Sequence, residues 1–134
     1  MGNPYELFKT SQDAENAGIL VNYGDFAIKV KRAGEGNKAF KRAFTSFSKR
    51  HKTSIDMETL DDDVAKAALI KIFAEHVLVD WVGVCGEDGE ALEFNSENAT
   101  KLLTDLPALF QDLRQRALDF RNFRTKELES LVGN

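Results

Sequence analysis

Cysteine is almost absent from this sequence, and so are the segments that direct a protein into a membrane or an oxidising compartment. Cys85 is the only cysteine among 134 residues, which excludes an intrachain disulfide and any zinc site built from several cysteines of one chain. No run of about 18 apolar residues occurs, so a membrane-spanning helix is excluded. The first residues lack the apolar core of a signal peptide. We therefore expect the protein to remain in the reducing cytoplasm in which it is made.

A large excess of charge of one sign is also missing. The net charge of −4, with 43% apolar and 30% charged residues, is ordinary for a soluble globular protein and gives no general attraction to nucleic acid or anionic membranes. A chain of 134 residues can bury a substantial core in one domain. We predict a flexible N-terminal arm over 1–17, a single helical domain over 18–130 and a frayed C-terminus over 131–134.

The spacing of apolar residues predicts a mainly α-helical fold. Apolar residues recur every four positions from Leu69 to Trp81, which indicates a helix at the centre of the core. Asn37 is a candidate N-cap, and Pro107 suits the first turn of a helix. We predict three substantial helices over 38–52, 62–81 and 107–129, a short helix over 95–103, and a linker over 53–63.

Two segments have the alternation or the turn residues of small β-hairpins. Apolar residues alternate with polar or small ones over 25–31, and Gly24 separates this run from an earlier β-prone run. Residues 87–90 form a tight-turn sequence between short β-like runs within 82–94. One or two small hairpins are therefore predicted as a minor β component that packs on the helices.

The residue types from which catalytic sites are built are scattered along the chain. Cys85 could act as a nucleophile with His51 or His76 as its base, but a half-buried thiol in a hairpin is the interpretation that we favour. His76 and Asp80 are four residues apart and could share a metal ion. Since no third ligand lies nearby in the sequence, a surface ion pair is the favoured interpretation.

Neither of two glycine-containing segments matches a ligand-binding motif. Gly34-Glu35-Gly36 lacks the third glycine of a dinucleotide-binding loop, and no Gly-Lys-Ser/Thr follows it. Asp88-Gly89 has acidic neighbours but not the alternating oxygen ligands of a calcium loop. We predict a connector and a hairpin turn at these places, with no metal, no cofactor and no enzymatic activity.

The segment over 29–52 is strongly basic. Nine Lys/Arg and one acid give it a charge of +8, so the rest of the chain carries −12; 56–63 alone has five acids and no base. With Phe40, Phe44 and Phe47 interleaved, the segment could bind nucleic acid. The phenylalanines have helical spacing, however, and are better explained as core. We favour a basic face that is solvated or meets an acidic protein, or copies of this chain head to tail.

The order of several motifs resembles the tail assembly chaperones of long-tailed, lambdoid-type siphophages. The resemblance spans roughly 13–124. Its first block is Gly18-Ile-Leu-Val-Asn-Tyr-Gly-Asp-Phe-Ala-Ile-Lys-Val-Lys-Arg-Ala-Gly34 followed by Asn37-Lys-Ala-Phe40. Its second block is Asp80-Trp81-Val-Gly83-Val, Asp88-Gly89, Phe94, Asn95-Ser-Glu97-Asn98 and Lys101-Leu-Leu-Thr-Asp-Leu-Pro107.

The resemblance implies a non-enzymatic role in the host bacterial cytoplasm during phage assembly. Such chaperones bind the long tape measure protein, keep it soluble, help the tail tube protein to polymerise around it, and are absent from the mature virion. In many of these phages a ribosomal frameshift adds a second domain that recruits the tube protein. The resemblance then implies that the extension joins near Leu128–Asn134.

We expect the partner to bind an apolar strip that core packing leaves exposed beside the basic face. The candidates are Phe47, Phe120 and Phe123, with Lys41 and Arg42 as neighbouring cations. Two other functions stay open at this point: a nucleic-acid-binding phage regulator that uses 29–52, and a minor tail structural protein retained in the virion.

Overall fold

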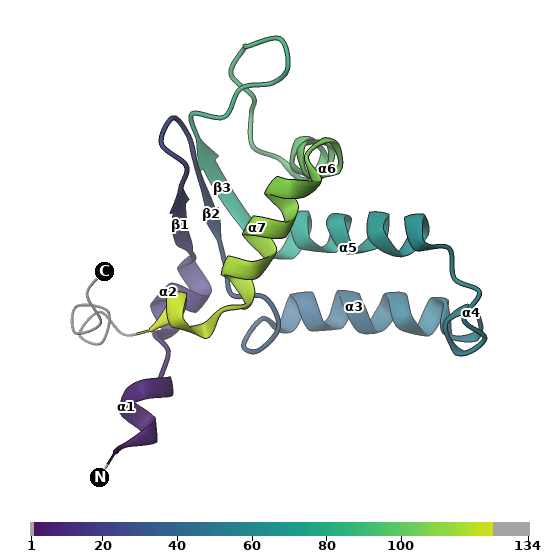
Figure 1. Cartoon of the computed structure of the whole chain (residues 1–134), viewed down its shortest axis with the longest axis horizontal. Coiled ribbons are helices and arrows are strands. Elements are labelled where there is room, and N and C mark those ends of the chain that lie inside the picture. The colour runs from purple at the N-terminus through teal and green to yellow at the C-terminus, as the bar shows by residue number, and fades with distance from the viewer. Residues whose placement is uncertain (1, 125–134) are drawn as a thin grey trace.

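Helices account for most of the structure, which is a computed structural model and describes residues 2–124. Within these residues there are seven α-helices, a three-stranded antiparallel sheet and a final 3₁₀ turn, η1 (Figure 1). The prediction of a mainly α fold with a minor β component is confirmed. The helices are α1 Pro4–Phe8, α2 Gln12–Ala17, α3 Lys38–Arg50, α4 Lys52–Asp56, α5 Asp62–His76, α6 Ser96–Asp105 and α7 Pro107–Leu118, the strands are β1 Ile19–Asn22, β2 Ala27–Val30 and β3 Leu78–Val82, and η1 is Phe120–Phe123.

The sheet has the order β1-β2-β3, with both neighbouring pairs antiparallel. The predicted hairpin over 19–31 is confirmed as β1 and β2. Val21 faces Ile28, and Ile28 faces Trp81 on β3, so these three buried side chains form one row on the face that packs on the helices. The alternation correctly predicted that Ile28 and Val30 are buried, but Ala27 on the other face of the strand is buried as well.

The third strand corrects the prediction of one helix over 62–81, because α5 ends at His76. The four-residue spacing continues to Trp81, but Val77 and Val79 are β-branched, and the chain here can hydrogen-bond to an existing strand. The N–H of Lys31 donates to the carbonyl of Val77 at 2.8 Å. Since a two-stranded ribbon is marginal alone, pairing with β2 overrides the local helical pattern. His76 and Asp80 therefore do not share one helix face.

The start of α3 is fixed by Asn37, as predicted. Its Oδ1 accepts a hydrogen bond from the N–H of Phe40 at 3.0 Å, and its Nδ2 donates to the carbonyls of Arg32 and His76. The helix ends at Arg50 and is followed by α4 in a segment that was predicted to be a linker. An ion pair of 2.7 Å between Lys52 and Asp56, one helical turn apart, supports this short helix.

The C-terminal helices begin where the sequence predicts and end elsewhere. Asn95 caps α6, which continues to Asp105, two residues beyond the predicted end. The helix α7 begins at Pro107 but stops at Leu118, so the prediction of a helix to residue 129 is wrong. Asp119 has an extended backbone and its carboxylate caps η1, which turns the chain out of the helical path. The predicted end and the fraying over 131–134 lie outside the described residues.

The segment predicted as a flexible arm contains α1 and α2. The N–H of Ser11 donates to the carbonyl of Phe123 at 2.6 Å, and the ring of Phe8 stacks on that of Phe120 with centroids 5.0 Å apart. These contacts join the N-terminal segment to the chain after α7. The flexibility of 1–17 stays a prediction.

The turn over 82–94 is present as predicted, but with a single isolated β-bridge between Cys85 and Ala91. Gly89 has a positive φ of 78°, and the side chain of Asp88 accepts a hydrogen bond from the N–H of Glu90. The indole N–H of Trp81 donates to the carbonyl of Leu92 at 2.8 Å and so fixes this loop to β3. The Asp-Gly sequence thus makes a turn, as expected.

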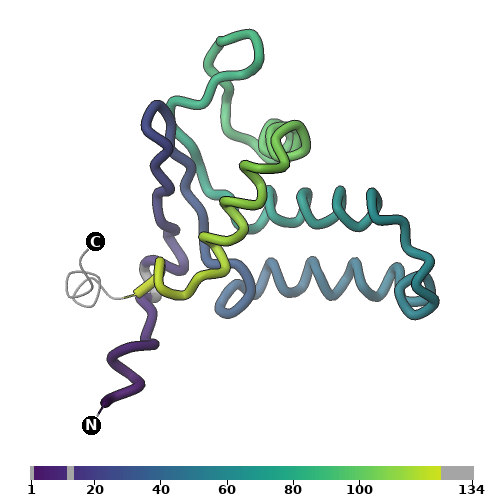
Figure 2. The backbone as a smooth tube through the Cα atoms, in the orientation of Figure 1, coloured from purple at the N-terminus to yellow at the C-terminus, as the bar shows by residue number. Residues whose placement is uncertain are grey.

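The core lies where the sheet, α5, α6 and α7 meet. Phe73 of α5 and Phe110 of α7 pack edge to face at 5.4 Å in its centre, beside the fully buried Ile28 and Leu103. By contrast, α3 and α5 lie side by side and project away from the sheet, with α4 at their far end (Figure 1; Figure 2). This projecting helical hairpin and α7 form the walls of the candidate site.

Candidate functional site

An apolar cavity of about 380 Å³ lies between α3, α5 and α7, at the base of the projecting hairpin. Phe73 and Ala33 are buried beneath it, while Phe40 and Leu69 are half-buried. The residues that line it are Ala33, Phe40, Lys41, Phe44, Thr45, Leu69, Phe73, Arg114 and Leu118. Most of this lining is hydrocarbon, so the cavity suits an apolar side chain of a ligand or partner.

Two large apolar side chains at this cavity are open to solvent. Phe44 on α3 is 44% exposed and Leu118 at the end of α7 is 50% exposed. The ring of Phe40 stacks on that of Phe44 at 6.1 Å, so the exposed phenylalanine is held by its neighbour. Exposed apolar groups that adjoin one cavity are a feature of protein-binding surfaces.

A second hollow of about 350 Å³ continues the cavity along α3 toward α4. Phe44 and Thr45 line both hollows, and Ile55, which is 40% exposed, stands at the far end. The second hollow is lined by Phe44, Thr45, Ser48, Lys49, Lys52, Ile55 and Asp56. We refer to the two hollows together as the α3 groove.

The rim of the α3 groove is basic. Lys41 and Arg114 stand at one end, and Lys49 and Lys52 at the other, against a single acid, Asp56. The pairs Lys41–Glu35 at 3.1 Å and Lys52–Asp56 at 2.7 Å are largely exposed, so water screens them and they are easily exchanged. The groove therefore has an apolar floor and a positive edge, although the whole chain has a net charge of −4.

A hydrogen bond between distant segments positions the α7 side of the groove. The hydroxyl of Tyr23, in the β1–β2 turn, donates to Asp112 of α7 at 2.5 Å, and Arg116 contacts the same carboxylate at 2.9 Å. Burial, followed by the bond to Asp112, raises the pKa of Tyr23 well above its usual range. The bond from Tyr23 is the largest cause that lowers the pKa of Asp112. The contact fixes α7, and with it Arg114 and Leu118, against the sheet.

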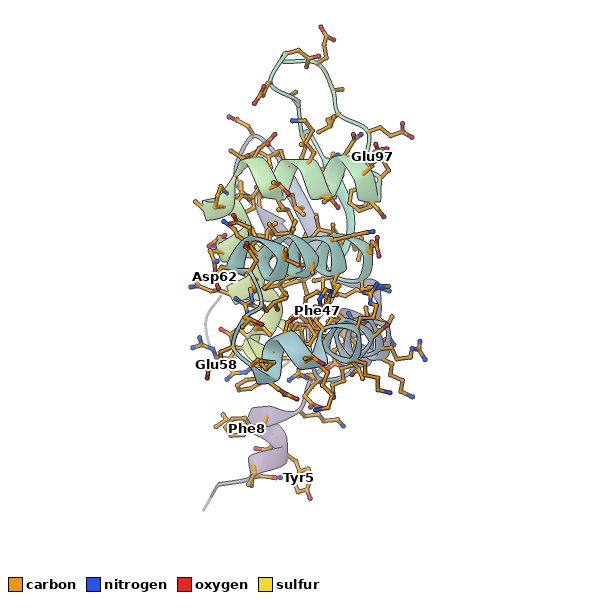
Figure 3. All side chains as sticks on the ribbon, turned by 90° about the vertical axis from the view of Figure 1, so that its right-hand side faces the viewer. Tyr5, Phe8, Phe47, Glu58, Asp62 and Glu97 are labelled. Atoms are coloured by element: carbon orange, nitrogen blue, oxygen red, sulfur yellow. The ribbon has the colours of Figure 1, made fainter. Side chains whose placement is uncertain are left out.

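The structure corrects the expected exposure of two candidate site residues. Phe47 is only 9% exposed and lies between α3 and α5 (Figure 3), because the two helices of the hairpin close over it. Phe123 is fully buried. Phe120 is half-buried, with Phe8 stacked on its ring and the guanidinium of Arg124 5.2 Å from its centroid. The expectation that Phe47 and Phe123 form an exposed strip is therefore wrong.

The two candidate cations differ in their relation to the groove. Lys41 lines it, and Arg42 is exposed on α3 but is not part of the lining. The sequence interpretation missed Phe44, which it assigned to the core, together with Leu118 and Arg114. The helical spacing of Phe44 was visible, but nothing in the sequence brings residues of α7 beside α3.

The residues considered for catalysis are not brought together. Cys85 is exposed and lines a separate pocket with an acidic rim, beside Glu87 and Asp88, whose lining contains no histidine. The ring of His51 packs on that of Phe47 at 4.6 Å, and His76 is 3.8 Å from Glu75. Among the side chains that the structure describes, which are those of residues 2–124 except Gln12 and Asp13, no three of His, Cys, Asp and Glu are grouped closely enough to hold a metal ion. In the same range, no helix has the length and apolar character needed to span a bilayer.

The chain was compared with protein families, curated proteins and solved structures. No curated protein and no solved structure matches this chain significantly. A sequence model of a family described as YdaY prophage protein matches residues 35–134. The matched range contains α3 to α7 and every residue that lines the α3 groove except Ala33. Since the match covers most of the chain, the protein belongs to the phage-associated YdaY prophage protein family.

Proposed function

We propose that this protein is a phage tail assembly chaperone that binds the tape measure protein through the α3 groove and promotes assembly of the tail tube. The observation that carries the proposal is the groove itself, in which exposed Phe44, Leu118 and Ile55 follow one continuous hollow. Membership of a prophage family and the resemblance of the motifs over 13–124 to tail assembly chaperones support it.

A groove of this kind suits an amphipathic helix of a partner. Such a helix places apolar side chains at i, i+3, i+4 and i+7 on one face, and these fit a hydrophobic groove between helices. A tape measure protein offers many helical segments in sequence. Several copies of the chaperone, each of modest affinity, would bind it firmly together and still be released when the tube closes around it.

The remaining features of the role are part of the same proposal. The protein acts without catalysis, in the host cytoplasm, and leaves before the virion is mature. It contacts the tail tube protein through a frameshift-extended form, and copies of the chain associate along the tape measure protein. Mass spectrometry of purified virions separates this role from that of a minor tail structural protein, because a chaperone is missing from the particle.

The direct test is co-expression with the tape measure protein encoded by the same prophage, followed by co-purification. The double variant Phe44→Asp/Leu118→Asp places two charges in the groove and should abolish co-purification. The matched control is Leu20→Asp/Val82→Asp, which changes two somewhat more exposed apolar side chains on the sheet and should bind as the unaltered chain does. Circular dichroism verifies that both variants are folded. Equal binding by the groove variant contradicts the proposal.

The nucleic-acid alternative is favoured only by the exposed cations of α3. It predicts an affinity for DNA or RNA that falls steeply with salt and is weakened by Lys41→Glu/Arg42→Glu. The exposed aliphatic side chains of Leu118 and Ile55 in the groove argue against it, since they neither bind phosphates nor stack on bases. A gel-shift titration at two salt concentrations decides between the two functions.

A further inference from the structure

We infer that the α3 groove selects amphipathic helices that have carboxylates beside their apolar face, so that its partner segment is acidic. The inference rests on the proposed function and specifies the chemistry of the segment that is bound. It follows from the position of the charges around the groove, and not from the overall charge of the chain, which has the opposite sign.

The first argument is the number and position of the cations. Four bases and one acid line the two hollows, and they stand at the edges of an apolar floor. Within the described part of the chain, Arg114 and Lys49 take part in no ion pair. Both therefore remain available to a partner. A lysine-flanked helix would meet like charge at both ends of the groove.

The second argument comes from carboxylates of the chain itself. Glu35 already contacts Lys41, and Asp56 already contacts Lys52, each through an exposed pair. These contacts mark two places at which a carboxylate is accepted next to the groove. Because exposed pairs of this kind have little net stability, a carboxylate from a partner can replace them at small cost.

The third argument is the distance between the cations along the helix. Lys41 and Lys49 are eight residues apart on α3, which is about 12 Å at the usual rise per residue. A partner helix that lies along α3 therefore reaches both with carboxylates roughly two turns apart. Between them its apolar side chains meet Phe44, and toward the base they meet Leu118. The complementary segment thus has glutamate or aspartate at both ends of a short leucine-rich face.

A second pocket on the same molecule offers an internal contrast. It lies between the loop after β3 and α6 and has a volume of about 490 Å³, larger than either hollow of the α3 groove. Its rim includes Glu87, Asp88 and Asp105 against Lys101. Its floor is also apolar. An acidic helix should therefore enter the α3 groove and avoid this pocket, although both could accept leucine side chains.

The test uses two synthetic helical peptides of about 15 residues with the same leucines at i, i+4 and i+7, flanked by glutamate in one and lysine in the other. Fluorescence anisotropy with the full chain should show the glutamate peptide binding at least about tenfold more tightly. Its affinity should fall as salt is raised, because the contacts with the rim are exposed.

Reversing the charge of two cations on the rim tests whether the α3 groove is the source of the selectivity. Lys41→Glu/Arg114→Glu should invert the preference of the chain for the two peptides. The control Lys9→Glu/Lys71→Glu makes the same change of charge on two exposed residues that line neither the groove nor the second pocket, and it should preserve the preference. A chain that binds both peptides equally, or neither, overturns the inference. If the tape measure protein still co-purifies in that case, the proposed function stands without this selectivity. If the peptides behave as expected but the tape measure protein does not co-purify, the selectivity stands, and the partner is a different protein with an acidic helix.

Discussion

The hydroxyl of Tyr23 is a single polar atom that joins the sheet to α7. Tyr23→Phe removes the donor to Asp112 and should lower the free energy of unfolding by about 1 kcal/mol at neutral pH. Because the native pKa of Asp112 is depressed, this stability is present above the ordinary carboxyl pKa and is lost as the pH falls through the native value. The difference between the two proteins should therefore shrink in acid.

Urea unfolding at neutral pH and at about pH 2–3 checks this dependence. Tyr5→Phe is the control, since Tyr5 is exposed and its hydroxyl is not part of such a contact. A difference in stability that is the same at both pH values would show that the effect is one of packing and not of the ionised carboxylate.

Substitution of Phe123 and of Phe44 should distinguish a residue of the core from a residue of the binding surface. Phe123 is fully buried, so Phe123→Ala should lower the free energy of unfolding by about 3–5 kcal/mol. Phe44 is half open to solvent, and Phe44→Ala should cost less than half of that while it weakens partner binding. Thermal denaturation of both variants measures the contrast. A larger loss of stability for Phe44→Ala would assign Phe44 to the core.

At the scale of elements, Asn37 links three parts of the fold. Its side chain caps α3 and also donates to the carbonyl groups of Arg32, before the helix, and of His76, at the end of α5. Asn37→Ala should lower the free energy of unfolding by about 2 kcal/mol, because the cap and both donated bonds are lost. Asn37→Ser keeps a capping oxygen without the amide donor and should be intermediate. Equal losses for the two variants, measured by urea unfolding, would mean that the cap contributes nothing.

The starts of helices could be predicted from the sequence, because they depend on local chemistry. Asn37, Asn95 and Pro107 each mark the beginning of a helix within a residue of the prediction. The ends of α5 and α7 could not be predicted. They depend on pairing with β2 in the first case and on the turn at Asp119 in the second, and the periodicity of apolar residues shows neither.

The candidate site could be predicted only in part, because it too depends on contacts between segments that are distant in the sequence. Lys41 belongs to a basic run that is visible in the sequence, and it does line the groove. Leu118 and Arg114 lie more than 60 residues beyond the end of α3 in the sequence, and the tertiary fold brings them beside it. Helical spacing predicted that Phe44 faces Phe40 and Phe47. It could not show that the helices across the groove leave the ring of Phe44 exposed to solvent.

At the scale of the whole molecule, burial is uneven. From residue 48 to residue 69, all of which the structure describes, no side chain is buried, whereas α7 has Phe110, Leu113 and Ala117 fully buried. The unburied range is the far part of the projecting hairpin, seen end-on in Figure 3. Local opening needs the least free energy where buried contacts are few. The hairpin should therefore open more often than the rest of the domain.

Hydrogen–deuterium exchange should show this difference directly. Backbone amides in 48–64 are expected to exchange much faster than those in α7, because opening the hairpin exposes little apolar surface. Addition of the glutamate-flanked peptide should slow exchange over 41–56, where a ligand in the groove covers α3 and α4, and leave the turn at Gly89 unchanged. Slowed exchange over 83–95 instead would place the peptide in the acidic-rimmed pocket, and the basic rim of the α3 groove would then have no part in binding.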